Sequence, residues 1–341
     1  MKGIAAVSVR SRAAGICSLL TVLTASVGLV AVMAGSATAG RTAGPVKIAY
    51  LSFAVANSYD APMLAAAKAA AKGKATITVL DANNDPKTQF SQLQTAATSK
   101  QYDAIIVQPI FGTGLVSEVK AAISNGVKVV NMDQELGPNL STAKPQVPGL
   151  SGNVVFVPTA IGTKLGNLTV QACTAKKLDP CNVGYLYDIK ASALDVAIRS
   201  AFNKAIAGHS SVKVVSEGQS FFTPSKGLAA VQTMIQANAN INMIVGSDQG
   251  IEGAVQAVDP SKVTLIGYGG SASGLKGVAA GTWYGTIVQL PATEGRLAVQ
   301  CAIKAVQTGK SCGGVDPVDA VPSAGVVTKA NVSKFKGEWP G

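Results

Sequence analysis

The sequence predicts an α/β protein with two doubly wound parallel-sheet lobes joined by a three-strand hinge. Short apolar segments alternate with helix-like segments at intervals of roughly thirty residues, which is the length of a βαβ unit. Proline-containing breaks interrupt this alternation at 136–158, after the strand-like segment 286–291 and at 313–328. Three breaks predict a chain that crosses between the lobes three times, so that each lobe is discontinuous in sequence.

Eight apolar segments are predicted to be strands. Parallel strands are covered by helices on both faces, and their sequences are therefore almost continuously apolar. Further strand-like segments lie at 154–157 and 286–291. The eight main strands are predicted at 47–53, 75–83, 102–109, 127–134, 181–188, 212–218, 242–250 and 263–270.

The segments between the strands have helical patterns. Segment 60–72 is rich in Ala and has apolar residues at helical spacing. Asp85 followed by Pro86 is typical of a helix start. The predicted helices are 60–72, 86–99, 115–125, 160–177, 192–207, 224–238, 250–258, 271–280 and 292–308.

A chain of roughly 300 residues after an N-terminal signal favours two domains over a single core. The three breaks divide the chain into a signal peptide and two discontinuous lobes. We predict a signal at 1–39, an N-terminal lobe made of 46–157 and 290–322, and a C-terminal lobe made of 158–289 and 323–341.

The first 39 residues have the features of a secretory signal. Lys2, Arg10 and Arg12 form a basic start, an apolar run occupies 16–33, and 37–39 is an A-x-A cleavage site. We expect cleavage after this site and export to the periplasm or beyond the cytoplasmic membrane. The alternative is an uncleaved membrane anchor, because the apolar run is long enough to span a bilayer.

The net charge argues against nucleic acid as a partner. The formal charge is +11, and the three basic residues of the signal account for part of it. The remaining basic residues are spread along the chain without a Lys/Arg run, whereas nucleic-acid binding needs a clustered basic stripe.

Four cysteines follow the signal, and a fifth, Cys17, lies within it. An even number of cysteines in an exported chain favours local disulfides. We predict two of them, Cys173–Cys181 and Cys301–Cys312. A zinc site is the weaker alternative, because the sequence has no C-x-x-C and a single histidine, His209.

Motifs for nucleotide and calcium binding are incomplete. Gly309-Lys310-Ser311 resembles the end of a phosphate loop, but the glycine required at 304 is a lysine. The segment 81–85 has calcium-loop spacing, but Pro86 replaces the required glycine. We therefore interpret Gly309 as a helix end and Asp85 as a helix cap.

The sequence contains no convincing catalytic group. Asp133 and Glu135 could imitate a glycosidase carboxylate pair, but no apolar neighbour or second partner that would raise a pKa is evident. His209 is expected in a turn, and no serine lies in a G-x-S-x-G elbow. We expect a protein that is not an enzyme and needs no metal or cofactor.

Polar residues gather where the predicted strands end. Open parallel sheets bind ligands at the carboxyl ends of their strands. Amides, a carboxylate and an aromatic face suit a sugar, although helix capping alone would explain Asp60 and Asp248. The strand-end residues are Asn57, Ser58, Tyr59, Asp60, Gln108, Asp133, Gln134, Ser247, Asp248 and Gln249.

Five motifs, taken in order, resemble those of the ribose/galactose-type (type I) periplasmic substrate-binding proteins of ABC importers, over residues 47–335. The motifs are Asn57-Ser58-Tyr59, Asp133 in VVNMDQ, Phe222 in FFTPSKG, Ser247-Asp248 in VGSDQ and Gln289 in IVQLP. The resemblance implies the type I fold and ligand contacts from these residues. It also implies an aromatic sandwich of the ligand by Tyr59 and Phe222.

Several positions depart from the family pattern. Gln134 and Ser247 replace the family's arginine and asparagine, and Gly269 replaces an aspartate. The expected binding arginine falls on Ile198, with Arg199 beside it. Charge-assisted bonds to hydroxyls are therefore fewer, so ribose itself is not expected. The full predicted ligand set is Asn57, Tyr59, Asp60, Gln108, Asp133, Gln134, Arg199, Phe222, Ser247, Asp248, Gly269 and Gln289.

The resemblance implies a monomeric receptor that captures one small ligand, expected to be a sugar, and delivers it to an ABC importer permease. Its alternatives are a sensor component that docks on a signalling receptor and a binder of a non-sugar metabolite. Closure is expected at crossings near 157–158, 289–291 and 321–324, where Pro158, Pro291 and Pro322 lie.

Overall fold

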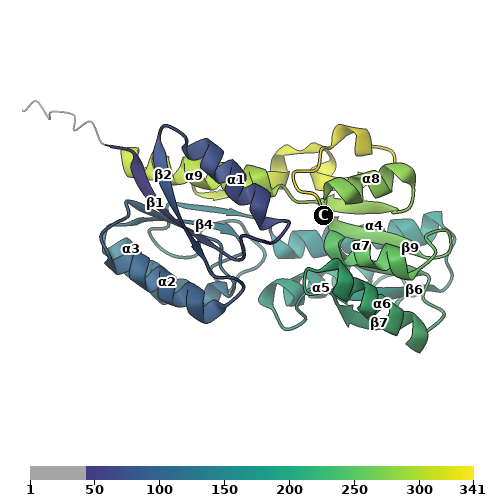
Figure 1. The fold of residues 1–341 in the computed structure, drawn as a ribbon. Coiled ribbons are helices and arrows are strands. Elements are labelled where there is room, and N and C mark those ends of the chain that lie inside the picture. Colours follow the sequence, from purple (N-terminus) through teal and green to yellow (C-terminus); the bar gives the residue numbers. More distant parts are fainter. Residues whose placement is uncertain (1–43) are drawn as a thin grey trace, which may run out of the picture. The chain divides into compact units, whose positions relative to one another are not determined.

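The computed structural model describes residues 44–341, which form two six-stranded sheets flanked by helices (Figure 1). The predicted signal at 1–39 lies outside the described residues. The first sheet, in spatial order, consists of β11 (Gly314–Val315), β5 (Gly152–Val155), β4 (Lys128–Asp133), β3 (Ala104–Val107), β1 (Val46–Ser52) and β2 (Ala75–Asp81). The second consists of β12 (Val326–Thr328), β10 (Gly285–Val288), β9 (Thr264–Gly269), β8 (Met243–Ser247), β6 (Cys181–Tyr187) and β7 (Val212–Gln219).

The strand pairs of both sheets are parallel except for β10 and β12, which run antiparallel. In each sheet the order reverses beside the first strand of the lobe, β1 or β6, as in doubly wound folds. The predicted fold class of two doubly wound lobes is confirmed.

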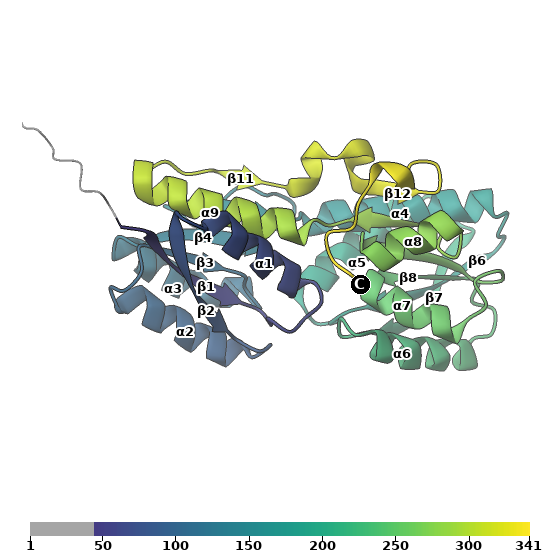
Figure 2. The same ribbon diagram turned by 45° about the horizontal axis from the view of Figure 1, so that its top comes forward.

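Four helices cover the first sheet: α1 (Asp60–Ala71), α2 (Pro86–Thr98), α3 (Gly112–Ser124) and α9 (Pro291–Thr308). Successive side chains of β1 point to opposite faces because a strand has a period of two. Ile48 and Tyr50 pack with α1 and α9, whereas Ala49 and Leu51 pack with α2 and α3. Figure 2 shows α9, late in the sequence, lying beside α1 in this lobe.

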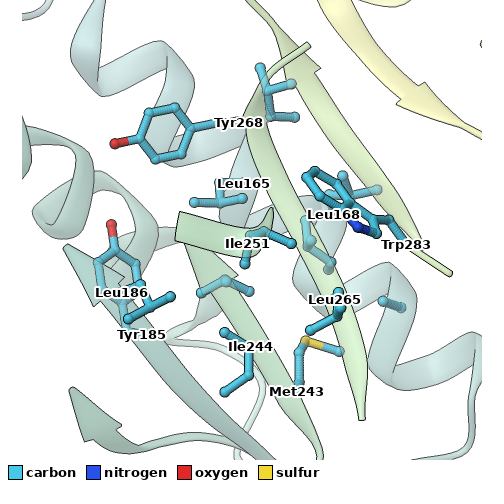
Figure 3. Packing of buried hydrophobic residues seen from close by; sticks show 14 of the residues in the cluster. Leu165, Leu168, Tyr185, Leu186, Met243, Ile244, Ile251, Leu265, Tyr268 and Trp283 are labelled. Atoms are coloured by element: carbon cyan, nitrogen blue, oxygen red, sulfur yellow. The ribbon is translucent and has the colours of Figure 1, made fainter. Parts of the chain in front are cut away.

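Five helices cover the second sheet: α4 (Pro158–Ala175), α5 (Ala193–Ile206), α6 (Pro224–Ala237), α7 (Asp248–Ala257) and α8 (Ala272–Ala280). Their apolar side chains form one core with the strands, part of which Figure 3 shows. Leu165 of α4 and Ile251 of α7 are fully buried against strand residues such as Leu265. This packing rigidly places the strand ends that carry the polar residues.

Three segments connect the sheets: 156–157 between β5 and α4, 289–290 between β10 and α9, and 316–325 between β11 and β12. Pro158 and Pro291 are the first residues of α4 and α9, where a missing backbone N–H costs nothing. Pro322 begins a short 3₁₀ segment in which Ser323 and Ala324 have φ of 53° and 47°. These positions coincide with the predicted crossings.

The strand-like segment 154–157, which the prediction places in the N-terminal lobe, overlaps β5 of the first sheet. One element boundary differs from the predictions at an informative place. The strand predicted at 242–250 ends at Ser247, and α7 begins at Asp248. The reason is capping, because the Ser247 hydroxyl accepts a hydrogen bond from the backbone N–H of Gly250 at 3.2 Å.

Both predicted disulfides are present in the structure. Cys173 in α4 is bonded to Cys181 at the start of β6, with their Cα atoms 5.8 Å apart. Cys301 in α9 is bonded to Cys312 just before β11, with a Cα separation of 5.7 Å. Each bond links a helix to the chain that follows it in the same lobe.

The incomplete calcium and phosphate motifs have the helix-capping and helix-ending roles predicted for them. Asp85 caps α2 by accepting from the backbone N–H of Lys87 at 2.9 Å, and Gly309 ends α9 with φ of 71°. Within residues 44–341, no helix is long and apolar enough to cross a membrane. The same residues contain no cluster of His, Cys, Asp or Glu that could hold a metal ion.

Candidate functional site

A cavity lies at the carboxyl ends of the strands and is lined by both lobes. The first lobe contributes residues that follow or end β1, β3 and β4. The second contributes residues near the ends of β6 to β9, together with Gln289 after β10 and Trp339 of the C-terminal segment. The lining consists of Phe53, Asn57, Tyr59, Asp60, Gln108, Asp133, Gln134, Leu194, Phe222, Ser247, Gln249, Tyr268, Gln289 and Trp339.

Nine of the twelve predicted ligand residues therefore line one cavity, and Arg199, Asp248 and Gly269 do not. The nine are Asn57, Tyr59, Asp60, Gln108, Asp133, Gln134, Phe222, Ser247 and Gln289. Tyr59 and Phe222 come from different lobes, as the predicted sandwich requires, and contact of these residues with a ligand stays a prediction.

Gln108 holds two carboxylates at the floor of the cavity. Its Nε2 donates to Asp60 Oδ1 at 2.6 Å and to Asp133 Oδ2 at 3.1 Å. Its Oε1 accepts from the backbone N–H of Phe53 at 3.1 Å, so the amide nitrogen must face the carboxylates. One neutral amide thus positions two acidic groups side by side.

The backbone of Asp133 is unusual. Asp133 ends β4 with a φ of 68°, in the left-handed region that non-glycine residues rarely occupy. Such conformations persist where the surrounding structure holds them, and they concentrate at functional sites. Here the turn out of β4 brings the carboxylate into the cavity lining.

A third carboxyl group lies behind the lining. The Tyr59 hydroxyl donates to Glu294 Oε2 at 3.3 Å, and Glu294 is fully buried at the start of α9. Glu294 Oε1 has no hydrogen-bond partner among the described residues. Tyr59 therefore joins the cavity wall to a buried acid.

Burial dominates the electrostatics of these acids. It raises the pKa of Asp60 to about 7 and that of Asp133 to about 6, against the lowering effect of the Gln108 hydrogen bond on each. Burial also raises the pKa of Glu294 well above its ordinary value, and the nearby Asp133 charge adds to this. No Lys, Arg or His lines the cavity in the described chain.

In the second lobe a buried carboxylate orients three hydroxyls. Asp188 accepts hydrogen bonds from Ser220 Oγ at 2.5 Å, from Ser247 Oγ at 2.6 Å and from the Tyr268 hydroxyl. Ser247 and Tyr268 line the cavity, but their hydroxyl protons are already donated to Asp188. They shape the wall and leave their lone pairs to other groups.

Polar atoms remain free in the lining. Asn57 Nδ2, Asp133 Oδ1 and the side-chain amides of Gln134 and Gln289 make no hydrogen bond within residues 44–341. These atoms provide both donors and acceptors between aromatic side chains. Such a set offers hydrogen-bonding partners to a small hydroxylated molecule.

The lobes also contact each other directly beside the cavity. Gln249, in the first turn of α7, donates to Ser58 Oγ at 3.0 Å and approaches Asn57 Oδ1 at 3.5 Å. Ser58 and Asn57 belong to the loop after β1 in the other lobe. The described conformation is therefore one in which the lobes meet across the cavity.

The C-terminal segment forms part of the site. The Trp339 ring packs edge-on against Tyr59 with centroids 5.3 Å apart, and its indole N–H donates to the Gly269 carbonyl at 2.8 Å. Next to it, the Glu338 carboxylate accepts from the backbone N–H of Thr293 at 2.8 Å and from its hydroxyl at 2.6 Å. Residues 338–339 thus contact α9 and the start of α1 in the first lobe as well as the second sheet.

Arg199, which is predicted to contact the ligand, does not line the cavity in the described residues. Its guanidinium lies 4.7 Å from the centre of the Tyr185 ring and pairs with Glu217 at 3.0 Å. Arg199 Nε also donates to the Tyr187 hydroxyl at 3.1 Å. The side chain fastens α5 to the edge of the second sheet instead.

Asp248 and Gly269 support the site from behind. Asp248 is fully buried and accepts from Thr286 Oγ1 at 2.7 Å and from Ser271 N and Oγ at 2.7 and 2.8 Å. Gly269 has φ of 138°, and a Cβ there would lie 2.6 Å from Trp339. Gly269 therefore leaves room for the Trp339 ring.

The carboxylate pair considered for glycosidase chemistry does not converge. Asp133 lines the cavity, but Glu135 is absent from the lining. Glu135 Oε2 accepts from Asn153 at 3.2 Å and from Gln146 at 3.3 Å in the loop beside β5. The two carboxylates therefore have different partners and do not face a common site.

Several lining residues escaped the predicted ligand set: Phe53, Leu194, Tyr268 and Trp339. Gln249 is among the predicted strand-end residues but is not in the predicted ligand set. Phe53 directly follows β1, and its position at the strand end could have indicated it. No spacing in the sequence marks Trp339, because it reaches the cavity through the docking of the C-terminal segment.

A cavity closed by two α/β lobes, with free donors and acceptors among aromatic rings, defines a two-lobed solute-binding protein. The comparisons agree with this class. The profile of the family described as "Periplasmic binding protein domain" matches residues 48–311, and the chain belongs to this family.

Curated relatives and solved structures are similar over most of the chain. The D-allose-binding periplasmic protein of Escherichia coli (strain K12) is 27% identical over 253 residues, which cover 71% of this chain and 77% of the relative. The ribose import binding protein of Haemophilus influenzae is 25% identical over 308 residues, 88% and 97% of the two chains. An ABC transporter solute binding protein from Mycobacterium smegmatis, solved with bound glycerol, superposes with a TM-score of 0.72 at 24% identity, covering 87% of this chain and all of the other.

Proposed function

We propose that this protein is an exported solute-binding protein that captures a small hydroxylated molecule, a sugar or polyol, and delivers it to an ABC importer permease. The observation that carries the proposal is the set of free polar atoms on Asn57, Asp133, Gln134 and Gln289 inside a cavity lined by both lobes. Hydroxyl groups need both donors and acceptors, and this set supplies them.

Ring stacking supports the same class of ligand. Tyr59, Phe222 and Trp339 offer apolar faces, and the apolar face of a sugar packs on aromatic rings. The two relatives are named for the binding of allose and of ribose, and the solved structure holds glycerol. These ligands share hydroxyl groups and small size.

In this proposal the protein binds and releases its ligand unchanged. Asp133 accepts two ligand hydroxyls through its carboxylate, and Gln134 and Gln289 donate to ligand oxygens. The protein acts as a monomer outside the cytoplasmic membrane, after the signal has been removed. Capture and release by hinge motion at the three connections complete the cycle.

Calorimetry with a panel of pentoses, hexoses, alditols and inositols tests the proposal, together with mass spectrometry of any ligand that co-purifies. We expect saturable binding of one member and recovery of the same molecule after incubation. Uptake of that molecule should be lost when the gene is deleted. Absence of binding across the panel, or recovery of a chemically altered molecule, would overturn the proposal.

A further inference from the structure

The ionisable charged side chains that line the cavity are all acidic. Asp60 and Asp133 both line it, and the lining contains no Lys, Arg or His. The ion pairs within residues 44–341 involve Glu217 and Asp259, which lie elsewhere. The two cavity carboxylates are therefore not neutralised by a basic side chain in the described chain.

The protein positions these carboxylates with a neutral group. Gln108 Nε2 donates to both, at 2.6 Å to Asp60 and 3.1 Å to Asp133, and so holds the two carboxyl groups close together. An amide satisfies their hydrogen-bonding needs in part but carries no charge. Asp133 Oδ1 remains available to a ligand.

A third, buried acid lies beside the same two carboxyl groups. Glu294 is fully buried, its Oε1 has no partner among the described residues, and Tyr59 connects it to the cavity wall. Three acidic groups in one low-dielectric region repel each other when ionised. A positive charge in the cavity would relieve this repulsion.

The walls of the cavity independently suit a cation. Five aromatic side chains line it: Phe53, Tyr59, Phe222, Tyr268 and Trp339. The face of an aromatic ring attracts an ammonium group, and tryptophan does so most strongly. Carboxylates at the floor and aromatic rings on the walls form together the surroundings that bind protonated amines.

We propose that the ligand carries a protonated amine in addition to its hydroxyl groups, as in an amino sugar or an amino alditol. This inference rests on the proposed function and narrows its ligand class. The ammonium group would lie against Asp133 and Asp60, and the hydroxyls would be bound by Asn57, Gln134 and Gln289. The same field would exclude sugar acids and sugar phosphates.

Matched pairs of ligands test the inference by calorimetry near neutral pH and low ionic strength. The pairs are D-galactose with D-galactosamine, D-glucose with D-glucosamine, and D-sorbitol with 1-amino-1-deoxy-D-sorbitol. In whichever pair binds, we expect the amine to bind about tenfold more tightly than its neutral partner. The reason is that a carboxylate attracts the ammonium group in a low dielectric. N-acetylation, which removes the charge, should abolish this preference.

Variants separate charge from shape. Asp133→Asn keeps the size of the side chain but removes its charge, and it should reduce the amine preference by about tenfold. Glu118→Gln, on α3 and outside the cavity, removes the same charge and should leave the preference intact. Added salt should weaken the amine more than the neutral partner.

The outcomes distinguish the two proposals. Equal or tighter binding of the neutral members would overturn the amine inference and leave the proposed function standing. Binding of gluconate or of a sugar phosphate in preference to both would also overturn it. If neither the pairs nor the wider panel of pentoses, alditols and inositols binds, both proposals are wrong.

Discussion

At the scale of single residues, Asp133 combines features that point to a direct role in binding. Its backbone is in the left-handed region, one of its carboxylate oxygens is free, and it lines the cavity between the two lobes. Both carboxylate oxygens of the neighbouring Asp60 already accept hydrogen bonds within the protein. One accepts from Gln108 and the other from the backbone N–H of Ala54 at 3.2 Å. The two acids therefore differ in role although they share one partner.

We expect Asp133→Ala to weaken binding of the identified ligand by about 2–5 kcal/mol, because a charged acceptor is removed from a closed cavity. Calorimetry measures the change, and thermal unfolding checks that the fold survives. Ser99→Ala, at the end of α2 and away from the cavity, is a suitable control. An unchanged affinity in Asp133→Ala would contradict the assignment.

Trp339 is one of four lining residues that lie outside the predicted ligand set and its strand-end residues. Its ring packs on Tyr59, and its N–H is bound by the Gly269 carbonyl. We expect Trp339→Ala to weaken ligand binding by about 1–3 kcal/mol through loss of the ring face. Trp339→Phe should retain part of the affinity, because the ring remains although the N–H bond is lost.

The fold itself must tolerate that substitution if the interpretation is correct. Calorimetry on both Trp339 variants, compared with their melting temperatures, decides the matter. A large loss of stability in Trp339→Ala with normal affinity in the remaining folded protein would show that the ring belongs to the core of the second lobe.

At the scale of elements, the strands and helices could be predicted because parallel strands buried on both faces are apolar throughout. Val129 and Val130 lie on opposite faces of β4, and both are fully buried. Asn57, Gln108 and Gln134 could be predicted for the same topological reason, since carboxyl ends of parallel strands meet at one edge. Position after a strand is visible in the sequence.

Tertiary contacts explain why some of the predicted ligand residues do not line the cavity. Arg199 was expected in the cavity, but the distant Glu217 on β7 holds it against Tyr185. Asp248 was expected to face a ligand, but Thr286 and Ser271 from later strands and loops satisfy it. These partners are 18 to 38 positions away along the chain, so no local sequence pattern indicates them.

The two disulfides fasten helices α4 and α9 to the chain that follows them. We expect the double substitution Cys173→Ala with Cys181→Ala to lower stability by about 2–3 kcal/mol, because closing a loop of this length restricts the unfolded chain. Denaturant unfolding measures the loss, and non-reduced peptide mapping of the unaltered protein checks the pairing. Free thiols in the map would refute the assignment.

At the scale of the whole molecule, buried acids couple stability to pH. Burial raises the pKa of Asp60 and of Asp188 to about 7, and that of Asp133 and of Asp248 to about 6. Between the ordinary carboxyl pKa and these raised values, the folded protein binds more protons than the unfolded chain. The contribution of these groups to stability is therefore present at low pH and lost as pH rises through 6 to 7.

We accordingly expect the melting temperature of the ligand-free protein to fall between pH 5 and pH 8. Asp60→Asn should reduce the slope of this fall, because one of the titrating groups is removed. Calorimetric scans across this range measure both. A melting temperature that rises with pH, or a slope that is the same in Asp60→Asn, would contradict burial as the cause.

At the largest scale, we expect motion between the lobes. Three short connections join the sheets, and two of them lead directly into helices that begin with Pro158 and Pro291. Proline fixes φ, so rotation is confined to the few residues before it. The third connection contains Ser323 and Ala324 in left-handed conformations. Each lobe has its own buried core, which favours movement of near-rigid bodies.

Contacts across the cavity should then depend on the ligand. Gln249 with Ser58, and Glu338 with Thr293, bring the lobes together in the described conformation. We expect ligand to decrease the radius of gyration in small-angle scattering and to shorten distances between labels on α2 and α6. Gln249→Ala should weaken ligand binding modestly without touching the Asp133 carboxylate, because it removes a bond made only when the lobes meet. If saturating ligand changes neither the radius nor the label distances, closure is not how this protein holds its ligand.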